Sequence, residues 1–325
     1  MSKKNKAWWK AAAAGAFLAA IVLAGLAAAG VMQPRGGSTR AAQVPAAPAR
    51  RPEQGIILFQ SRVGKGPWQI FSLDLATGAR TRLTRSSSDD LYPSASPDGS
   101  RIAFESAREG SAAIWRMRSD GTGPDRLTDA RFVCHAPCWG SGSSSVLYSS
   151  PRFGREQIFA MELGTRRERQ LTDSFWSSIL PAVSPDGSVI AFARNKLGWD
   201  VYRMKPDGSG AMALTSEGGN CRPDWSPDGK RIAYVSDVAD GKGDVWTMDA
   251  DGGNKIRVTM GDDSYDYNPD WSPDGRWLVY ETTTGSKRNP WSLAVIPAGG
   301  GTPVLLSPPG ADDRYPDWEP GKDGR

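Results

Sequence analysis

"PDWSPDGKRIAYVS" occupies residues 223–236, and residues 269–282 repeat it as "PDWSPDGRWLVYET". Further copies, complete or partial, stand at residues 92–106, 136–150, 180–194 and 315–325. The proline near the start of each copy recurs every 42 to 47 residues, at Pro93, Pro137, Pro181, Pro223, Pro269 and Pro316. A fixed period of about 20 to 50 residues predicts a repeat architecture.

Each repeat reads as a series of short strands. Ser226 to Gly229 places Ser, Pro and Gly where a type I turn prefers them, so a hairpin is expected there. The run after this turn, RIAY, is rich in branched and aromatic residues, as strands are. A third apolar run follows at 245–248, then a glycine-rich turn, and a last run ends in Leu-Thr or Val-Thr. The unit therefore predicts four strands and no helix.

Four-stranded units of this length stack most naturally as blades around an axis, and the copies predict an all-β, six-bladed β-propeller of antiparallel blades. The first blade is split. Residues 55–84 supply three strands, and residues 314–318 supply the missing innermost one. Closing the ring in this way joins both ends of the domain in one sheet and removes two free edges.

The repeat resembles that of the TolB-like six-bladed propellers, which is recognised by the string W-S-P-D-G-x-x-[IL]-[AV]-[FY]. The resemblance covers about residues 55–325. It implies a binding module whose partner segment enters the channel mouth, although similar propellers also cap serine peptidases and a fold alone does not settle activity. TolB itself carries an α/β domain ahead of its propeller, whereas about fifty residues precede the first blade here.

The residues ahead of the propeller predict three segments. Residues 1–10 are basic, residues 11–32 contain no charge, and residues 33–54 form a linker rich in Pro, Ala and Arg. A run of 22 uncharged residues is long enough to cross a bilayer, which favours a retained single-pass anchor in the cytoplasmic membrane. Export after signal cleavage is the alternative. Either reading places the propeller outside the cytoplasm, in the periplasm.

Charge separates these segments from the propeller. Residues 1–54 hold four lysines, four arginines and one acid, a net charge of +7, so the remaining residues carry −3 of the chain's +4. The basic character of the chain therefore belongs to its first segments. A basic face on the propeller is not indicated, and we expect no nucleic-acid partner.

Acidic residues stand in the loop before every innermost strand, at Asp89, Asp90, Asp129, Asp173, Glu217, Asp262, Asp263, Asp312 and Asp313. They predict a negative rim at one mouth of the channel, which would attract a basic peptide segment or a calcium ion. The alternative is that these acids cap turns, as aspartates commonly do. Tyr92, Tyr267 and Tyr315 lie near the same mouth and join the candidate ligand-binding set.

Catalytic residues are scarce in the sequence. His135 is the single histidine, so a multi-histidine metal site is excluded and a structural role is favoured for it. No G-x-S-x-G motif is present. Among three cysteines, Cys134 and Cys138 are the candidates for a disulfide, provided the chain folds back between them.

Two functions remain open at this point. The first is a monomeric, membrane-tethered propeller that binds an envelope protein or peptide segment, without a cofactor. The second is an enzyme, a hydrolase or lyase acting on a sugar, lactone or peptide, with a carboxylate or calcium site in the channel. No individual catalytic residue is predicted for it.

Overall fold

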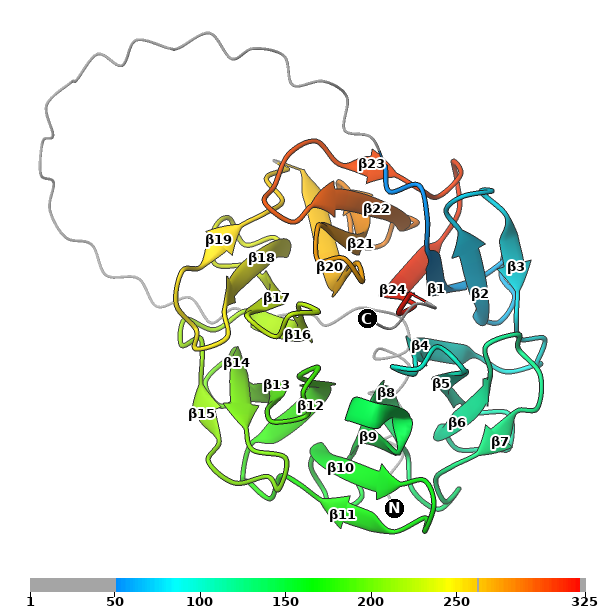
Figure 1. Cartoon of the computed structure of the whole chain (residues 1–325), viewed down its shortest axis with the longest axis vertical. Helices are drawn as coiled ribbons and strands as arrows, with labels where there is room; N and C mark the ends of the chain where they lie inside the picture. The colour runs from blue at the N-terminus through cyan, green and yellow to red at the C-terminus, as the bar shows by residue number, and fades with distance from the viewer. Residues whose placement is uncertain (1–50, 262, 322–325) are drawn as a thin grey trace, which may run out of the picture. The chain divides into compact units, whose positions relative to one another are not determined.

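A computed structural model describes residues 51–261 and 263–321 of the chain, and these form a six-bladed β-propeller (Figure 1). The predicted segments 1–10, 11–32 and most of 33–54 lie outside the described residues. Within the described residues, no helix is long and apolar enough to cross a membrane.

Each blade is a four-stranded antiparallel sheet, as predicted. Blades 1 to 3, innermost strand first, contain β24 (Asp313–Trp318), β1 (Ile56–Ser61), β2 (Gln69–Asp74) and β3 (Arg80–Arg82); β4 (Asp90–Ala95), β5 (Arg101–Ser106), β6 (Ala113–Arg118) and β7 (Asp125–Arg126); and β8 (His135–Trp139), β9 (Ser145–Ser150), β10 (Gln157–Glu162) and β11 (Glu168–Gln170). Blades 4 to 6 contain β12 (Ser177–Val183), β13 (Ile190–Asn195), β14 (Trp199–Met204) and β15 (Met212–Ala213); β16 (Asn220–Trp225), β17 (Arg231–Ser236), β18 (Asp244–Asp249) and β19 (Ile256–Arg257); and β20 (Ser264–Trp271), β21 (Trp277–Thr284), β22 (Ser292–Pro297) and β23 (Val304–Leu305). A short 3-10 helix, Ser141–Ser143, replaces the usual turn in blade 3.

The ring closes as the sequence predicts. Strand β24 pairs antiparallel with β1, placing Trp318 opposite Ile57 and Asp313 opposite Ser61. Trp318 packs into the same apolar cluster as Ile57 and Phe59. The last strand therefore completes the first blade.

The Ser-Pro-Asp-Gly segments form the predicted tight hairpins. The N–H of Gly229 donates to the carbonyl of Ser226 at 2.8 Å, closing the turn. The Ser226 hydroxyl donates to the carboxylate of Asp228 at 2.7 Å and accepts from the N–H of Arg231 at 2.9 Å. These side-chain bonds explain why Ser and Asp recur at fixed places in the motif.

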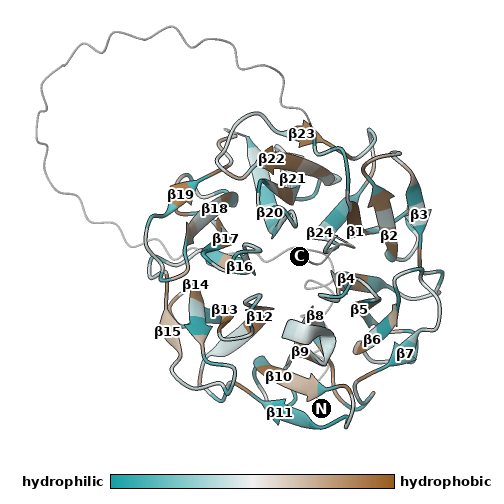
Figure 2. Ribbon diagram, viewed as in Figure 1, coloured by the Kyte–Doolittle hydropathy of each residue, from teal (hydrophilic) through white to brown (hydrophobic). Residues whose placement is uncertain are grey.

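The apolar core lies between blades, where the middle strands pack face to face. Figure 2 shows hydrophobic residues concentrated on middle strands such as β2 and β22, whereas β20 and β24 near the axis are largely hydrophilic. Tryptophans of the W-S-P-D-G motif join neighbouring blades: the indole N–H of Trp225 donates to the carbonyl of Ala182 at 3.1 Å. Trp139 makes the equivalent bond to Ser94 at 2.9 Å. Innermost strands are thereby fixed around a channel.

Candidate binding site in the propeller channel

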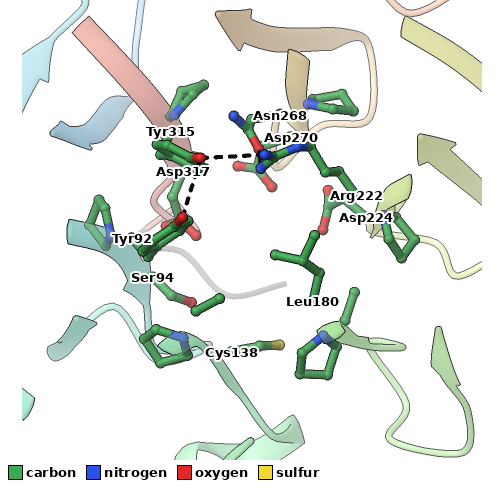
Figure 3. Close-up of a pocket in the computed structure, with 18 residues that line it drawn as sticks. Tyr92, Ser94, Cys138, Leu180, Arg222, Asp224, Asn268, Asp270, Tyr315 and Asp317 are labelled. Atoms are coloured by element: carbon green, nitrogen blue, oxygen red, sulfur yellow. Dashed lines mark hydrogen bonds between the residues drawn. The ribbon is translucent and has the colours of Figure 1, made fainter. Parts of the chain in front are cut away.

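Every innermost strand carries a β-bulge at the proline that marks the repeat. The residue before that proline has a φ angle between +46° and +58° in all six blades. We call these residues the first ring: Tyr92, Ala136, Leu180, Arg222, Asn268 and Tyr315. A residue before proline ordinarily adopts an extended conformation, and a non-glycine residue at positive φ costs about 1–2 kcal/mol. The ring repeats this cost, and its side chains line the channel (Figure 3).

The residues after the prolines form a second ring farther along the strands: Ser94, Cys138, Ala182, Asp224, Asp270 and Asp317. The two rings and the prolines between them enclose a cavity of about 170 Å³. Blades 3 and 4 give it small or apolar side chains, including Ala136 and Leu180. Blades 5, 6 and 1 contribute Arg222 and the three aspartates. The cavity therefore has one apolar wall and one polar wall.

An aromatic and cationic cluster occupies the first ring. The rings of Tyr92 and Tyr315 meet edge to face with centroids 4.3 Å apart, and their hydroxyls lie 3.3 Å apart. The Arg222 guanidinium donates to the Tyr315 hydroxyl at 3.3 Å and also to the side-chain oxygen of Asn268. Burial, together with Tyr315 and Glu105, raises the pKa of Tyr92 well above its usual value. These groups are held as one hydrogen-bonded set.

The aspartates of the second ring tie adjacent blades together. Asp224 accepts a hydrogen bond from the backbone N–H of Trp271 at 3.1 Å, and Asp317 accepts one from that of Ala95 at 2.8 Å. Asp270 accepts from the N–H of Trp318 in the same way. Burial raises the pKa of Asp224 to about 6 and that of Asp317 to about 8, and it raises the pKa of Asp270 well above the usual range.

Three acids of the predicted rim are buried in ion pairs. Asp90 accepts from Arg108 at 2.9 Å, and Asp313 accepts from Arg80 at 2.8 Å. Asp312 lies between Arg62, at 2.7 Å, and Arg314, at 2.9 Å. Arginines therefore offset the negative charge of these three acids, and their role in binding a cationic ligand stays a prediction.

The other predicted acids are spread around the mouth. Asp129 pairs with Arg131 in its own turn at 2.7 Å, and Asp263 pairs with Lys242 at 3.0 Å. Asp89 accepts from the backbone N–H of Trp68, and Glu217 accepts from that of Ser216. Asp173 lines a separate pocket beside Phe153, and Asp262 lies outside the described residues. In residues 51–261 and 263–321, no group of three or more His, Cys, Asp or Glu side chains could hold a metal ion.

Basic residues on this face follow a pattern that sequence reasoning missed, and two of them, Arg62 and Arg108, pair with acids of the predicted rim. A basic residue stands within two residues after the second strand of four successive blades, at Arg62, Arg108, Arg152 and Lys196. The loops after these strands lie on the same face of the ring as the predicted acidic loops, because successive strands are antiparallel. The same reasoning missed Arg222 and Asn268, which could have been found as the residue before each marker proline.

Tyr267, the third predicted tyrosine, lies beside the first ring. Its ring packs edge to face on Trp291 at 5.7 Å, and its hydroxyl accepts a hydrogen bond from the Lys287 ammonium at 2.6 Å. Tyr92 and Tyr315 line the cavity itself. The three tyrosines are thus brought to one side of the channel.

His135 and the cysteines are fixed in blade 3. The His135 ring nitrogens lie 3.7 Å from a Glu105 oxygen and 3.6 Å from a Glu156 oxygen. Burial by itself lowers the pKa of His135, but hydrogen bonds with both glutamates outweigh it and raise the pKa to about 10. The disulfide expected between Cys134 and Cys138 is not formed: Cys134 is buried in the core, Cys138 lines the channel, and both thiols are free.

Exposed apolar side chains gather on one face of the ring. We call the face that bears the loops leading into the innermost strands the mouth face. Its loops expose Val63, Phe153, Phe175, Leu197, Val238 and Met260, with Leu197 95% and Phe153 69% exposed. Other large apolar side chains exposed in the described part of the chain lie on outermost strands: Met212, Ile256 and Leu305. Six of the nine exposed large apolar side chains in the described part of the chain thus lie on the mouth face.

The chain is similar to several known proteins. A family model described as the TolB beta propeller domain matches residues 32–178 and again residues 178–323. An uncharacterised protein of Agrobacterium fabrum is 32% identical over 172 residues, which are 52% of this chain and 47% of that protein. The Tol-Pal system protein TolB of Francisella tularensis is 24% identical over 215 residues, which are 64% of this chain and 49% of that protein.

A solved structure shows the same architecture. The crystal structure of TolB from Acinetobacter baumannii superimposes with a TM-score of 0.72 at 25% sequence identity, over 82% of this chain and 67% of that chain. The chain spans about half the length of the curated relatives named above.

Proposed function

Because this chain belongs to the TolB beta-propeller family, we propose that its propeller is a binding module that takes up a segment of a partner protein through the mouth face. The observation that carries the proposal is the set of exposed apolar residues on mouth-face loops, which includes Phe153, Phe175 and Leu197. Exposed apolar side chains that gather on one surface are a common mark of protein interaction sites.

The channel cavity supports the same proposal. Its 170 Å³ equals about six water molecules at about 30 Å³ each, which is room for one or two side chains and not for a folded domain. An apolar wall with a few placed polar groups is the usual composition of a ligand site. A partner would therefore cover the mouth face and insert a short segment toward the first ring.

The cell envelope is the proposed setting. Relatives of this chain are named as proteins of the Tol-Pal system, and residues 11–32 have the length of a membrane anchor. We place the propeller in the periplasm, tethered through residues 33–54. Signal cleavage would give the same module in free form.

Site-specific photo-crosslinking tests the proposal in cells. A benzoylphenylalanine replaces Leu180 in the channel, Phe175 on the mouth face, or Met212 on the outermost strand of blade 4. The same protein is expected to be captured at Leu180 and Phe175 and not at Met212. Capture at Met212 to the same extent, or capture at none of the three, contradicts the proposal.

A second candidate function rests on Asp224 and Asp270. Their carboxyls lie close enough across adjacent blades for each to shift the pKa of the other, and the pKa of Asp270 lies well above its usual range because of burial and the neighbouring Asp224 charge. A carboxyl pair that shares a proton is a common acid and base arrangement in hydrolases. This function would be supported if the full-length chain turns over a sugar, lactone or peptide and D270N does not. If no turnover is found, the binding module is the only candidate function that remains.

A further inference from the structure

Two cations beside the channel have no carboxylate partner. Arg222 bonds to Asn268 and Tyr315, and Lys287 bonds to Tyr267; within the described residues neither forms a salt bridge. Several cations in the neighbouring mouth-face loops are paired, as Arg62 is with Asp312, Arg108 with Asp90, Arg152 with Glu168 and Lys242 with Asp263.

The two cations lie on the same tyrosine. The Arg222 guanidinium carbon is 5.8 Å from the centroid of the Tyr267 ring, and the Lys287 nitrogen is 4.8 Å from it. Arg222 comes from the innermost strand of blade 5, and Lys287 comes from a mouth-face loop of blade 6. Burial lowers the pKa of Lys287, and the Arg222 charge acts in the same direction. The fold thus holds two like charges near each other.

Carboxylates close to these cations are occupied elsewhere. Glu281 is buried and accepts a hydrogen bond from the backbone N–H of Tyr315 at 2.7 Å. Asp237 raises the pKa of Lys287 through its charge, yet it forms no salt bridge with it. Glu281 likewise acts on Arg222 through its charge without a salt bridge. An incoming carboxylate would give both partly desolvated cations a direct ion pair.

We propose that Arg222 and Lys287 form a carboxylate-binding subsite, which takes an acidic side chain or the terminal carboxylate of the partner segment. This inference rests on the proposed function and names the chemistry of the segment. A guanidinium carries five N–H donors in a planar fork that matches a carboxylate, and Asn268 and Tyr315 use two of them. Lys287 supplies a second positive charge. The partner segment is therefore acidic at this point, contrary to the basic segment expected from the sequence.

Short peptides test the subsite on the purified full-length chain. The probes are acetyl-Ala-Glu-Ala-amide, acetyl-Ala-Gln-Ala-amide and acetyl-Ala-Ala-Ala with a free carboxyl terminus, measured by saturation-transfer NMR. At least one acidic probe is expected to bind about tenfold more tightly than the glutamine peptide, since hydrogen bonds to charged groups are the stronger ones. Preference for the glutamate peptide identifies a side-chain carboxylate, and preference for the free-acid peptide identifies a chain terminus.

Matched variants locate the binding. R222Q and K287Q are each expected to weaken binding of the acidic probe by about tenfold. K65Q removes the same charge from an exposed lysine on the mouth face and should leave binding unchanged. Circular dichroism verifies that each variant is folded. If R222Q does not fold, K287Q still tests the subsite, because Lys287 lies in a loop.

Three results overturn the inference: equal binding of the glutamine peptide, no binding of either acidic probe, or binding that neither substitution weakens. The proposed function fails separately, when crosslinking at Leu180 and Phe175 captures no partner. If a partner is captured there but the acidic probes do not bind, the binding-module proposal is supported and the carboxylate-subsite proposal is refuted.

Discussion

Asp317, in the last strand of the chain, accepts a hydrogen bond from the backbone N–H of Ala95 in the second blade at 2.8 Å. Asp317 belongs to the first blade, so this bond joins blades 1 and 2 at the place where the chain closes on itself. Equivalent bonds from Asp224 and Asp270 join blades 5, 6 and 1. The aspartate of the repeat is therefore a connector between blades.

The first prediction concerns pH. Burial raises the pKa of Asp317 to about 8 from an unfolded value of about 3.9, so the folded state favours the protonated carboxyl. The stability contributed by this group is fully present below pH 4 and is lost as the pH rises toward 8. In urea unfolding, the stability of the native chain relative to D317N is expected to fall between pH 5 and pH 8.

Asp98 provides the control for this titration. It lies in an exposed turn, and hydrogen bonds from Ser96 and Ser100 lower its pKa. Its contribution is therefore constant above pH 5, and the difference between the native chain and D98N should not change over the same interval. An equal pH dependence for both variants would show that Asp317 is not responsible.

The second prediction concerns ring closure. A chain that ends at residue 312 lacks β24 and with it the buried Trp318, whose loss alone costs about 3–5 kcal/mol. Its unfolding temperature, followed by circular dichroism, is expected to fall by more than about 10 °C. A chain that ends at residue 321 keeps β24 and should melt as the full chain does. An unchanged melting curve for the shorter chain would refute the closure described above.

The third prediction concerns His135, which needs no assignment in NMR spectra because it is the single histidine. Its imidazole is expected to remain protonated at pH 8, since the hydrogen bonds with Glu105 and Glu156 raise its pKa to about 10 against the effect of burial. The stability that it contributes is present below its unfolded pKa of about 6.5 and is lost as the pH rises through 10.

Removal of one carboxylate tests the cause of this shift. E156Q is expected to lower the pKa of His135, because it removes the charge 3.6 Å from the imidazole. E109Q changes an exposed glutamate of blade 2 and should leave the pKa of His135 unchanged. An ordinary pKa near 6.5 in the native chain would contradict the ion-pair arrangement.

The fourth prediction concerns the contact between blades at Gly208. A Cβ atom at this position would lie 2.1 Å from the carbonyl oxygen of Leu171 in the preceding blade. Gly154 has a similar φ, +95° against +89°, but nothing lies within 4 Å of its Cβ position. Both substitutions by alanine incur about 1–2 kcal/mol of backbone strain, and G208A adds about 1–3 kcal/mol of overpacking. Chemical unfolding measures the loss of unfolding free energy in each variant. Equal losses for G208A and G154A would show that the blades can separate here.

Local chemistry made the fold predictable. The Ser-Pro-Asp-Gly turns, the strands on either side and the count of blades all follow from residues within one repeat, such as Ser226 and Asp228. The split first blade was predicted because the partial copy at 315–325 lacks a second half. Each of these features depends on contacts close in sequence or on the period itself.

The site was less predictable because its partners come from distant repeats. Asp312 and Asp313 were predicted to belong to a negative rim, yet they form ion pairs with Arg62 and Arg80, which lie more than 200 residues earlier in the sequence. The bulge at each marker proline rotates residues such as Arg222 into the channel, whereas the residue before a proline is ordinarily read as plain extended chain. Pairing between residues so far apart in the sequence leaves no local signature.

Completion of blade 1 by β24 also sets an order for assembly during translation. Blades 2 to 6 pair strands that leave the ribosome one after another, but the inner edge of β1 stays unpaired until the last strand emerges. A nascent or truncated product therefore displays an open strand edge, a form prone to aggregation and accessible to chaperones and proteases. Pairing with β24 hides that edge, so the ring can close only after residues 313–318 have been synthesised.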